Sequence, residues 1–71
     1  MNNDWKRIDI IYALNKQGTN LSRLSRKSGL NSRTLNNVFY RRYPKGERII
    51  ANEIGVPPQV IWPSRYTVGE I

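Results

Sequence analysis

Helix-breaking residues at short intervals limit the fold of this chain more than any other feature. They divide its 71 residues into segments too short for a long helix and are Gly18, Gly29, Pro44, Gly55 and Pro63. Glycine ends helices because it readily adopts positive φ, and proline lacks the N–H that a helix interior needs. So small a chain supports one compact core. We expect a single all-α domain of four or five short helices over residues 1–66, followed by an irregular tail, residues 67–71.

The first segment, residues 5–16, has the periodicity of an amphipathic helix. Its apolar side chains recur at spacings of three and four residues and are Trp5, Ile8, Ile11 and Tyr12. Residues suited to helix caps, Asn2, Asn3 and Asp4, precede it, and Gly18 follows it. We expect a helix that buries the face carrying these four apolar side chains.

Two further short helices are predicted on either side of Gly29. Residues 21–28 form the first, with Thr19 or Asn20 as its N-cap and with Leu21 and Leu24 turned inward. Residues 32–39 form the second, with Asn31 as its N-cap. Its buried side is predicted to carry Leu35, Val38 and Phe39.

The fourth helix has clear signals at both ends. Pro44 suits its first turn, Gly55 suits the position after its last residue, and residues 44–54 lie between them. Its inward side chains are predicted to be Ile50, Ala51 and Ile54. The following stretch "PPQVIW" begins with prolines and ends at Pro63, so it has room for about one helical turn.

Residues 21–39 meet several requirements of a helix-turn-helix motif together. The motif needs a small residue where the helices cross, a glycine in the turn and apolar residues that hold the second helix on the first. These places are filled by Ser25, Gly29, Leu30, Leu35 and Val38. Ser28 departs from the pattern, because this position is usually apolar. An ordinary αα-hairpin with a glycine turn is the alternative interpretation.

The charge of the chain is strongly regional. It has 12 Lys and Arg against 5 Asp and Glu, a net charge of +7, and no acidic residue between Asp9 and Glu47. Such a field favours a polyanionic partner, first nucleic acid and then an anionic membrane surface. A basic face that serves only solubility is the third possibility. Together with the helix-turn-helix pattern, the charge favours binding to double-stranded DNA.

In a helix-turn-helix protein the second helix enters the major groove. The exposed side chains of residues 32–39 that could read bases are Ser32, Arg33, Asn36 and Asn37. Arginine can donate two hydrogen bonds to guanine and asparagine can bridge adenine, so we prefer Arg33 and Asn37 as readers. Alternatively, Ser32 only supports the helix start, Arg33 neutralises a phosphate, and both asparagines are merely solvated.

The residues predicted to position the DNA backbone surround that helix. They are Arg23, Arg26, Lys27, Asn31, Tyr40, Arg41, Arg42 and Lys45. The helix start at Gly46 and Glu47 is a weaker candidate, because the charge of Glu47 opposes a phosphate unless it is turned away. Tyr40 and Tyr43 could equally pack on the core.

Catalysis, metal binding and cofactor binding have little support in the composition. The chain has no cysteine and no histidine, and its five carboxylates are scattered. We therefore expect no enzymatic activity, no cofactor and no metal. Neither a signal peptide nor a long apolar run is present in the sequence, so we expect a cytoplasmic protein without a membrane partner.

Three stretches of the sequence are distinctive: "DWKRIDIIYAL", "LSRLSR" and "PKGERIIANEIGVPPQVIWPSRY". In this order they resemble the beginning, the second helix and the C-terminal half of the Ner family, small DNA-binding repressors of Mu-like transposable phages and their bacterial relatives. The departure is Ser28, where the relatives tend to carry a bulky apolar residue. The resemblance implies a λ-repressor-like helical domain that represses early or lysogeny-controlling promoters. It does not identify the bases read by residues 32–37, because this part varies with the operator.

The resemblance also draws attention to the ending "IWPSRY". Trp62 and Tyr66 either close the core or contact a partner subunit, and the first is preferred. A single recognition helix discriminates few base pairs, so we expect two copies on one operator, with half-sites about 10–10.5 bp apart. Self-association is expected to be weak or DNA-dependent, through residues 62–66 or the start of the fourth helix. A non-specific or architectural DNA-binding protein is the main alternative, and RNA binding is disfavoured because no β-sheet stacking platform is predicted.

Overall fold

The computed structural model describes residues 4–66, and every regular element in this range is helical. The elements are α1 (Arg7–Lys16), α2 (Leu21–Lys27), the 3-10 helix η1 (Thr34–Phe39), α3 (Pro44–Ile54), α4 (Pro58–Ile61) and the 3-10 helix η2 (Pro63–Arg65). The predicted all-α class is confirmed. The cap residues 2 and 3 and the tail predicted for residues 67–71 lie outside the described residues.

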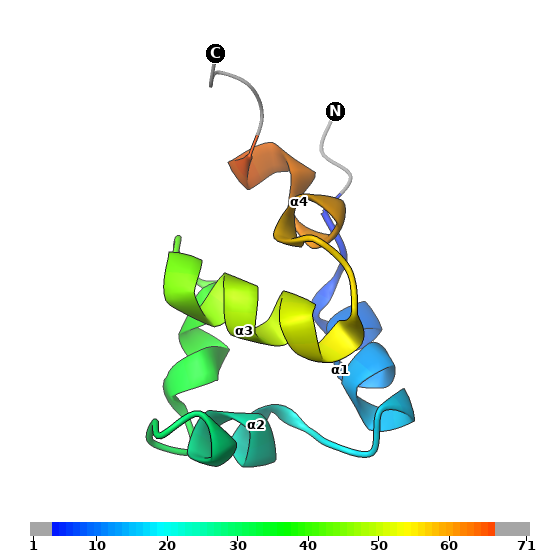
Figure 1. Ribbon diagram of the computed structural model, residues 1–71. Coiled ribbons are helices and arrows are strands. Elements are labelled where there is room, and N and C mark those ends of the chain that lie inside the picture. Colours follow the sequence, from blue (N-terminus) through cyan, green and yellow to red (C-terminus); the bar gives the residue numbers. More distant parts are fainter. Residues whose placement is uncertain (1–3, 67–71) are drawn as a thin grey trace.

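The central helix α3 crosses the middle of the molecule and holds the other elements together (Figure 1). It packs against α1, η1 and α4, while α2 packs against η1. In the view of Figure 1, α2 lies at the bottom, and α4 and η2 lie at the opposite end. The buried core draws on every α-helix and on η1, and consists of Ile10, Leu14, Leu24, Leu35, Val38, Ile50, Ala51, Ile61 and Trp62.

Helix α1 begins two residues later than predicted. The backbone N–H of Trp5 donates to the carbonyl of Ile61 at 2.9 Å, which ties this residue to α4. The N–H of Lys6 donates to the carboxylate of Asp9 at 3.0 Å, so Asp9 satisfies an unpaired donor at the helix start. A side chain inside the helix, that of Asp9, therefore caps the N–H of Lys6.

The predicted buried face of the first helix is wrong for Ile8 and Tyr12, whereas Trp5 packs against the core as expected. Ile10 and Leu14 are fully buried, whereas Ile8 is 67% exposed and Tyr12 is 65% exposed. The sequence "IDIIYAL" carries apolar residues on nearly every side of the helix, so two different faces satisfy the helical spacing. Packing against α3 selects the face with Ile10 and Leu14.

The capping residue and the glycines in the sequence predicted the positions of α2 and α3 well. The side chain of Asn20 accepts a hydrogen bond from the N–H of Arg23 at 2.9 Å, so Asn20 is the N-cap of α2. Gly29 has a φ of 80° and Gly55 a φ of 95°, which confirms both as left-handed residues after a helix. Helix α2 ends one residue before the predicted Ser28, and α3 has the predicted bounds.

The element predicted as an α-helix over residues 32–39 is instead a 3-10 helix over Thr34–Phe39. The N–H of Thr34 donates to the carbonyl of Asn31 at 3.0 Å, which forms a turn before the helix. The N–H of Leu35, which an α-helix would direct to that same carbonyl, donates to Oγ of Ser25 at 3.2 Å. A tertiary hydrogen bond therefore replaces the first bond of an α-helical turn.

The described residues end in two short helical turns, α4 and η2. The single turn predicted after the paired prolines is α4. The 3-10 helix η2 follows at once, and it keeps residues 63–66 against the rest of the domain, within the predicted domain of residues 1–66. Ser64 donates from its N–H and its hydroxyl to the carboxylate of Asp4, at 2.9 and 2.6 Å.

Candidate nucleic-acid interface

The turn between α2 and η1 has the features that the helix-turn-helix motif requires. Ser25 is fully buried where the two elements meet, and its hydroxyl accepts the bond from the N–H of Leu35. The N–H of Leu30 donates to the carbonyl of Ser25 at 2.9 Å. Leu35 and Val38 are fully buried beneath η1. The predicted motif is confirmed, with a 3-10 helix as its second element.

The 3-10 geometry divides the predicted base-reading residues between two edges of η1. Side chains three residues apart eclipse one another in such a helix. Arg33 and Asn36 therefore share the edge that faces α1 and α2, where they line a groove with Ser32. Asn37 shares the other edge with Thr34 and Tyr40. Thr34 was not among the residues predicted to contact DNA, although it lies three residues before Asn37.

The amide of Asn36 is turned inward. Its Oδ1 atom is buried and has no hydrogen-bond partner among the described residues. Bridging an adenine requires an accessible amide oxygen as well as the amide nitrogen. In this orientation Asn36 does not present its oxygen to a base edge. Arg33, which is exposed, and Asn37, which is half-buried, are the better placed of the predicted readers.

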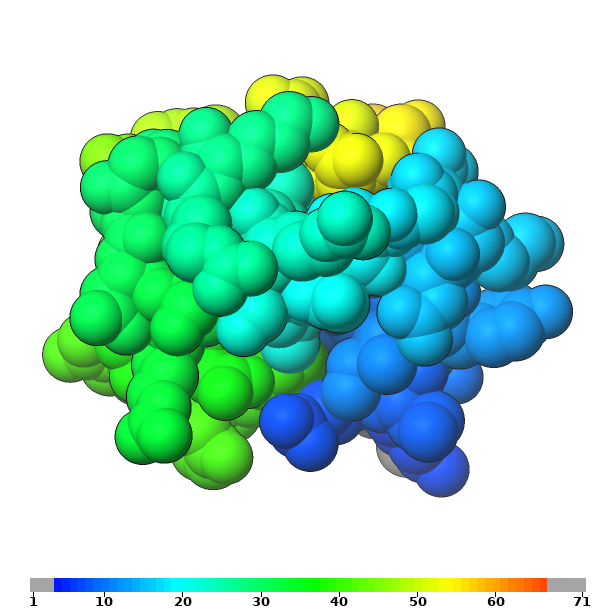
Figure 2. Space-filling model, turned by 90° about the horizontal axis from the view of Figure 1, so that it is seen from below, coloured from blue at the N-terminus to red at the C-terminus, as the bar shows by residue number. Residues whose placement is uncertain are grey.

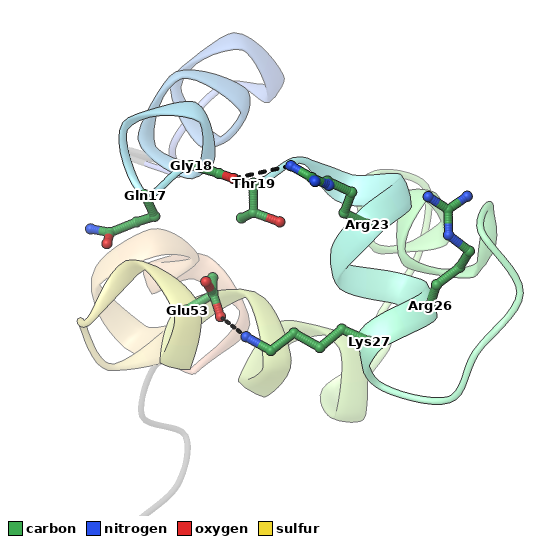
Figure 3. Close-up of a pocket in the computed structure, with 7 residues that line it drawn as sticks. All are labelled: Gln17, Gly18, Thr19, Arg23, Arg26, Lys27 and Glu53. Carbon is green, nitrogen blue, oxygen red and sulfur yellow. Dashed lines mark hydrogen bonds and ion pairs between the residues drawn. The ribbon is translucent and has the colours of Figure 1, made fainter.

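The three cations of α2 lie along a shallow groove of about 470 Å³ between the end of α1, α2 and α3 (Figure 3). Arg23 donates to the carbonyl of Gly18 at 3.4 Å, and Lys27 pairs with Glu53 at 3.4 Å. Both contacts are long and solvent-exposed, so they hold these side chains only weakly. Arg26 also lines this groove, and Figure 3 shows no interaction between it and the other residues drawn.

The other residues predicted to contact the DNA backbone differ in how much they interact within the folded protein. Arg41 and Lys45 are exposed, and Tyr40 is 78% exposed, so it does not pack on the core. The carbonyl oxygen of the Asn31 side chain accepts a hydrogen bond from the N–H of Arg33 at 3.0 Å. This hydrogen bond within the turn explains an asparagine at position 31 without any contact to a phosphate.

Arg42 is bound within the domain. Its guanidinium donates to the carbonyl of Arg65 at 2.7 Å and lies 5.0 Å from the centre of the Tyr66 ring. Its Nε atom is 3.8 Å from Oε2 of Glu47. These contacts engage the side chain in the folded protein, although half of it remains accessible to solvent.

Sequence reasoning missed the buried carboxylate that organises this region. Glu47 is fully buried and accepts hydrogen bonds from the N–H of Tyr43 at 2.9 Å, from Arg65 at 2.8 Å and from the hydroxyl of Tyr66. Burial by itself raises the pKa of Glu47, but these donors and the charge of Arg42 outweigh it, so the pKa lies below its ordinary value. The available signal was its place as the first acid after a long segment without acidic residues.

Arg7 was also missed as part of this face. It stands at the start of α1, and its guanidinium lies 5.3 Å from the centre of the Phe39 ring at the end of η1. Figure 2 shows the face formed by α2, with the first residues of α1 meeting the green segment that contains η1. The groove between these elements has a volume of about 400 Å³ and is lined by Arg7, Ile11, Asn20, Leu21, Ser22, Ser32, Arg33 and Asn36.

Two other kinds of site have no counterpart in the part of the chain that the structure describes. None of the helices in residues 4–66 is long and apolar enough to cross a membrane. Within the same residues, no group of three or more His, Cys, Asp or Glu side chains could hold a metal ion.

The packed pair of α2 and η1, its glycine turn and the surrounding cations define a helix-turn-helix DNA-binding protein. Comparison with known proteins agrees. The winged helix-turn-helix DNA-binding family matches residues 4–70. The described residues contain no strand, so the β-hairpin that gives that family its name has no counterpart in residues 4–66.

Individual relatives define the family more narrowly. The negative regulator of transcription of Escherichia phage Mu is 52% identical over 67 residues, which are 94% of this chain and 89% of the phage protein. The Mu-like prophage FluMu DNA-binding protein Ner of Haemophilus influenzae is 46% identical over 89% of this chain and 71% of its own length. The solution structure of the Mu Ner protein matches with a TM-score of 0.80 over 94% of this chain and 90% of that one. The chain belongs to the Ner family.

Proposed function

We propose that this protein is a sequence-specific regulator that represses transcription by binding a double-stranded DNA operator. The observation that carries the proposal is the half-exposed polar edge of η1, flanked by cations that have weak internal partners or none among the described residues. Similarity to proteins named as negative regulators of transcription supports repression. A bound domain that overlaps a promoter would exclude polymerase without any enzymatic step.

In this proposal η1 lies in the major groove. Arg33 donates two hydrogen bonds to a guanine, and Asn37 bridges an adenine. Ser32 supports the turn and contacts the nearest base or sugar, and Asn36 acts only if its amide rotates outward. Arg23, Arg26, Lys27, Arg41 and Lys45 contact phosphates and fix the register of the protein on the duplex. Three to five such contacts per subunit correspond to a log–log salt slope of roughly −3 to −5.

The test separates base reading from phosphate binding. Binding sites are selected from random DNA with the wild-type protein, and affinities for the selected duplex and a scrambled duplex are measured at fixed salt. Arg33→Ala should cost about 1–3 kcal/mol on the selected duplex and relax the preference at one base position. Arg41→Ala removes the same charge from an exposed position beyond the other end of η1 and should weaken binding to both duplexes alike.

Two results would contradict the proposal. If selection returns no preferred sequence, the protein is a non-specific or architectural DNA-binding protein. If Arg33→Ala weakens binding to both duplexes equally, Arg33 is a phosphate contact and does not read a base.

A further inference from the structure

We infer that the groove between α1 and the helix-turn-helix pair is a binding site for one phosphate of the DNA backbone, with Arg7 as its main cation. The inference rests on the proposed function, because the phosphate belongs to the duplex that η1 enters. It extends the DNA-binding surface to α1, an element outside the helix-turn-helix motif.

Side chains from separate parts of the chain converge on this groove. Arg7 comes from the first residue of α1, Ser22 from the first turn of α2, and Ser32 and Arg33 from the turn before η1. The hydroxyl of Ser22 donates to the carbonyl of Ser32 at 3.5 Å, which links the two halves of the motif at the groove. Guanidinium and hydroxyl groups are among the donors that proteins direct at phosphate oxygens.

The charge of the groove is unopposed. Arg7 and Arg33 both line it, and its lining includes no carboxylate. Asp9, the nearest acid in sequence, lines a different groove on α1 together with Trp5 and Tyr12. Neither Arg7 nor Arg33 forms an ion pair within residues 4–66. A phosphate bound by Arg7 is therefore not repelled by any acid that lines the groove, and the charge of Arg33 adds to the positive potential there while its guanidinium reads a base.

The Arg7 side chain is already held in place. Its guanidinium rests over the ring of Phe39, which is half-buried at the end of η1. Holding a long side chain before binding reduces the conformational entropy that binding must remove. The contact links the first residue of α1 to the end of η1, so it favours one position of the cation relative to η1.

The position of the groove selects a backbone phosphate over a base. When a recognition helix lies in the major groove, the preceding helix crosses the DNA backbone at the edge of that groove. Ser22 lies in the first turn of α2 and Ser32 in the turn before η1, and Arg7 lines the same groove. A phosphate contact carries no sequence information, so its loss should affect all duplexes alike.

The experiment compares Arg7→Met with Lys16→Met. Methionine keeps an unbranched stem over Phe39 and removes the charge. Lys16 is a matched control, because it lies at the other end of α1 and its ammonium rests 5.5 Å from the centre of the Tyr12 ring. Arg7→Met should reduce the magnitude of the log–log salt slope by about 0.9, the value for one phosphate. Lys16→Met should leave the slope unchanged, and Arg7→Lys should largely restore it.

The outcomes are distinct. The site is overturned if the wild-type protein binds its operator but Arg7→Met has the wild-type slope, or if Lys16→Met reduces the slope equally. Absence of DNA binding by the wild-type protein overturns the proposed function and this site with it. Because Arg7 is exposed, the variant should fold. If its unfolding midpoint falls, Arg7→Gln and Lys16→Gln are compared in the same way.

Discussion

At the residue scale, Glu47 connects two stretches of the sequence that resemble the Ner family, "PKGE" and "IWPSRY". It belongs to "PKGE", and two of its donors, Arg65 and Tyr66, belong to "IWPSRY". A buried carboxylate is costly unless hydrogen bonds and opposite charges surround it. The neighbouring Gly46 has no room for a side chain, since a Cβ there would meet the Tyr43 ring at 2.5 Å. These contacts explain why a glycine and a glutamate stand together at the start of α3.

Removing one donor to Glu47 should destabilise the fold. Tyr66→Phe keeps the ring and deletes the hydroxyl that donates to the carboxylate. Hydrogen bonds to charged groups contribute about 1.5–3 kcal/mol, and we expect a loss of free energy of unfolding in that range. Urea unfolding measures it. Tyr40→Phe, at a side chain that is 78% exposed, is the control and should change stability by less than about 0.5 kcal/mol. Equal effects of the two substitutions would contradict the role of Tyr66.

Acid should destabilise the protein through Glu47. The pKa of Glu47 in the folded protein lies below its ordinary value of 4.5, so the ionised form stabilises the fold. This stabilisation is fully present above that ordinary pKa and is lost as the pH falls from it through the lowered folded value. We expect urea midpoints to decline steeply below about pH 4.5. Glu47→Gln should be less stable at neutral pH and should show a shallower decline. A parallel decline in both proteins would assign the acid sensitivity to other groups.

At the scale of elements, the predictions from sequence were most reliable where residues in the element itself determine its structure. Pro44 and Gly55 act on their own backbone, and the bounds of α3 were predicted correctly. The buried face of α1 was missed because its apolar residues fit two faces, and only packing against α3 chooses between them. The 3-10 form of η1 depends on a bond to Ser25, ten residues away, which no periodicity reveals.

The same distinction applies to the candidate site. Exposed polar residues near a glycine turn can be found from sequence, so Arg33 and Asn37 were proposed from it. Arg7 and Glu47 act through contacts between distant elements, with Phe39 and Arg65 respectively, and such contacts require the fold. Tertiary contacts also explain why Arg42, which looks like any loop cation in sequence, is engaged inside the domain.

The hydrogen bond from Leu35 to Ser25 should control how firmly η1 is held. Ser25→Ala leaves the buried N–H of Leu35 without its acceptor, and an unsatisfied buried donor costs about 1–3 kcal/mol. Urea unfolding should show that loss. Ser28→Ala is the control, since the Ser28 side chain makes no hydrogen bond to another described residue, and it should stay within about 0.5 kcal/mol of wild type. Unchanged stability of Ser25→Ala would show that η1 keeps its position without this bond.

At the scale of the whole molecule, little apolar surface is left for a permanent partner. The large apolar side chains exposed in residues 4–66 are distributed over α1, the end of η1 and α4, and are Ile8, Tyr12, Tyr40 and Val60. Trp62 is only 2% exposed, and Tyr66 is bound to Glu47, which favours the interpretation that the C-terminal segment closes the core. Stable obligate dimers bury large and mainly apolar interfaces. Such dispersed side chains do not provide one.

We therefore expect the protein to be monomeric in solution and to pair on its operator. One recognition element with about four reading side chains discriminates few base pairs, while competing sites in a genome number roughly 10⁶ or more. Two copies on half-sites about 10–10.5 bp apart bind the same face of the duplex and multiply the discrimination. Sedimentation of the protein alone should give the mass of one chain, and sedimentation with the full operator should give two chains per duplex. A duplex with one half-site scrambled should bind only one chain. Its affinity should be lower than that of a chain on the intact operator, because the contact with a neighbouring copy is lost. A tight dimer without DNA, or a single chain on the intact operator, would show that this expectation is wrong.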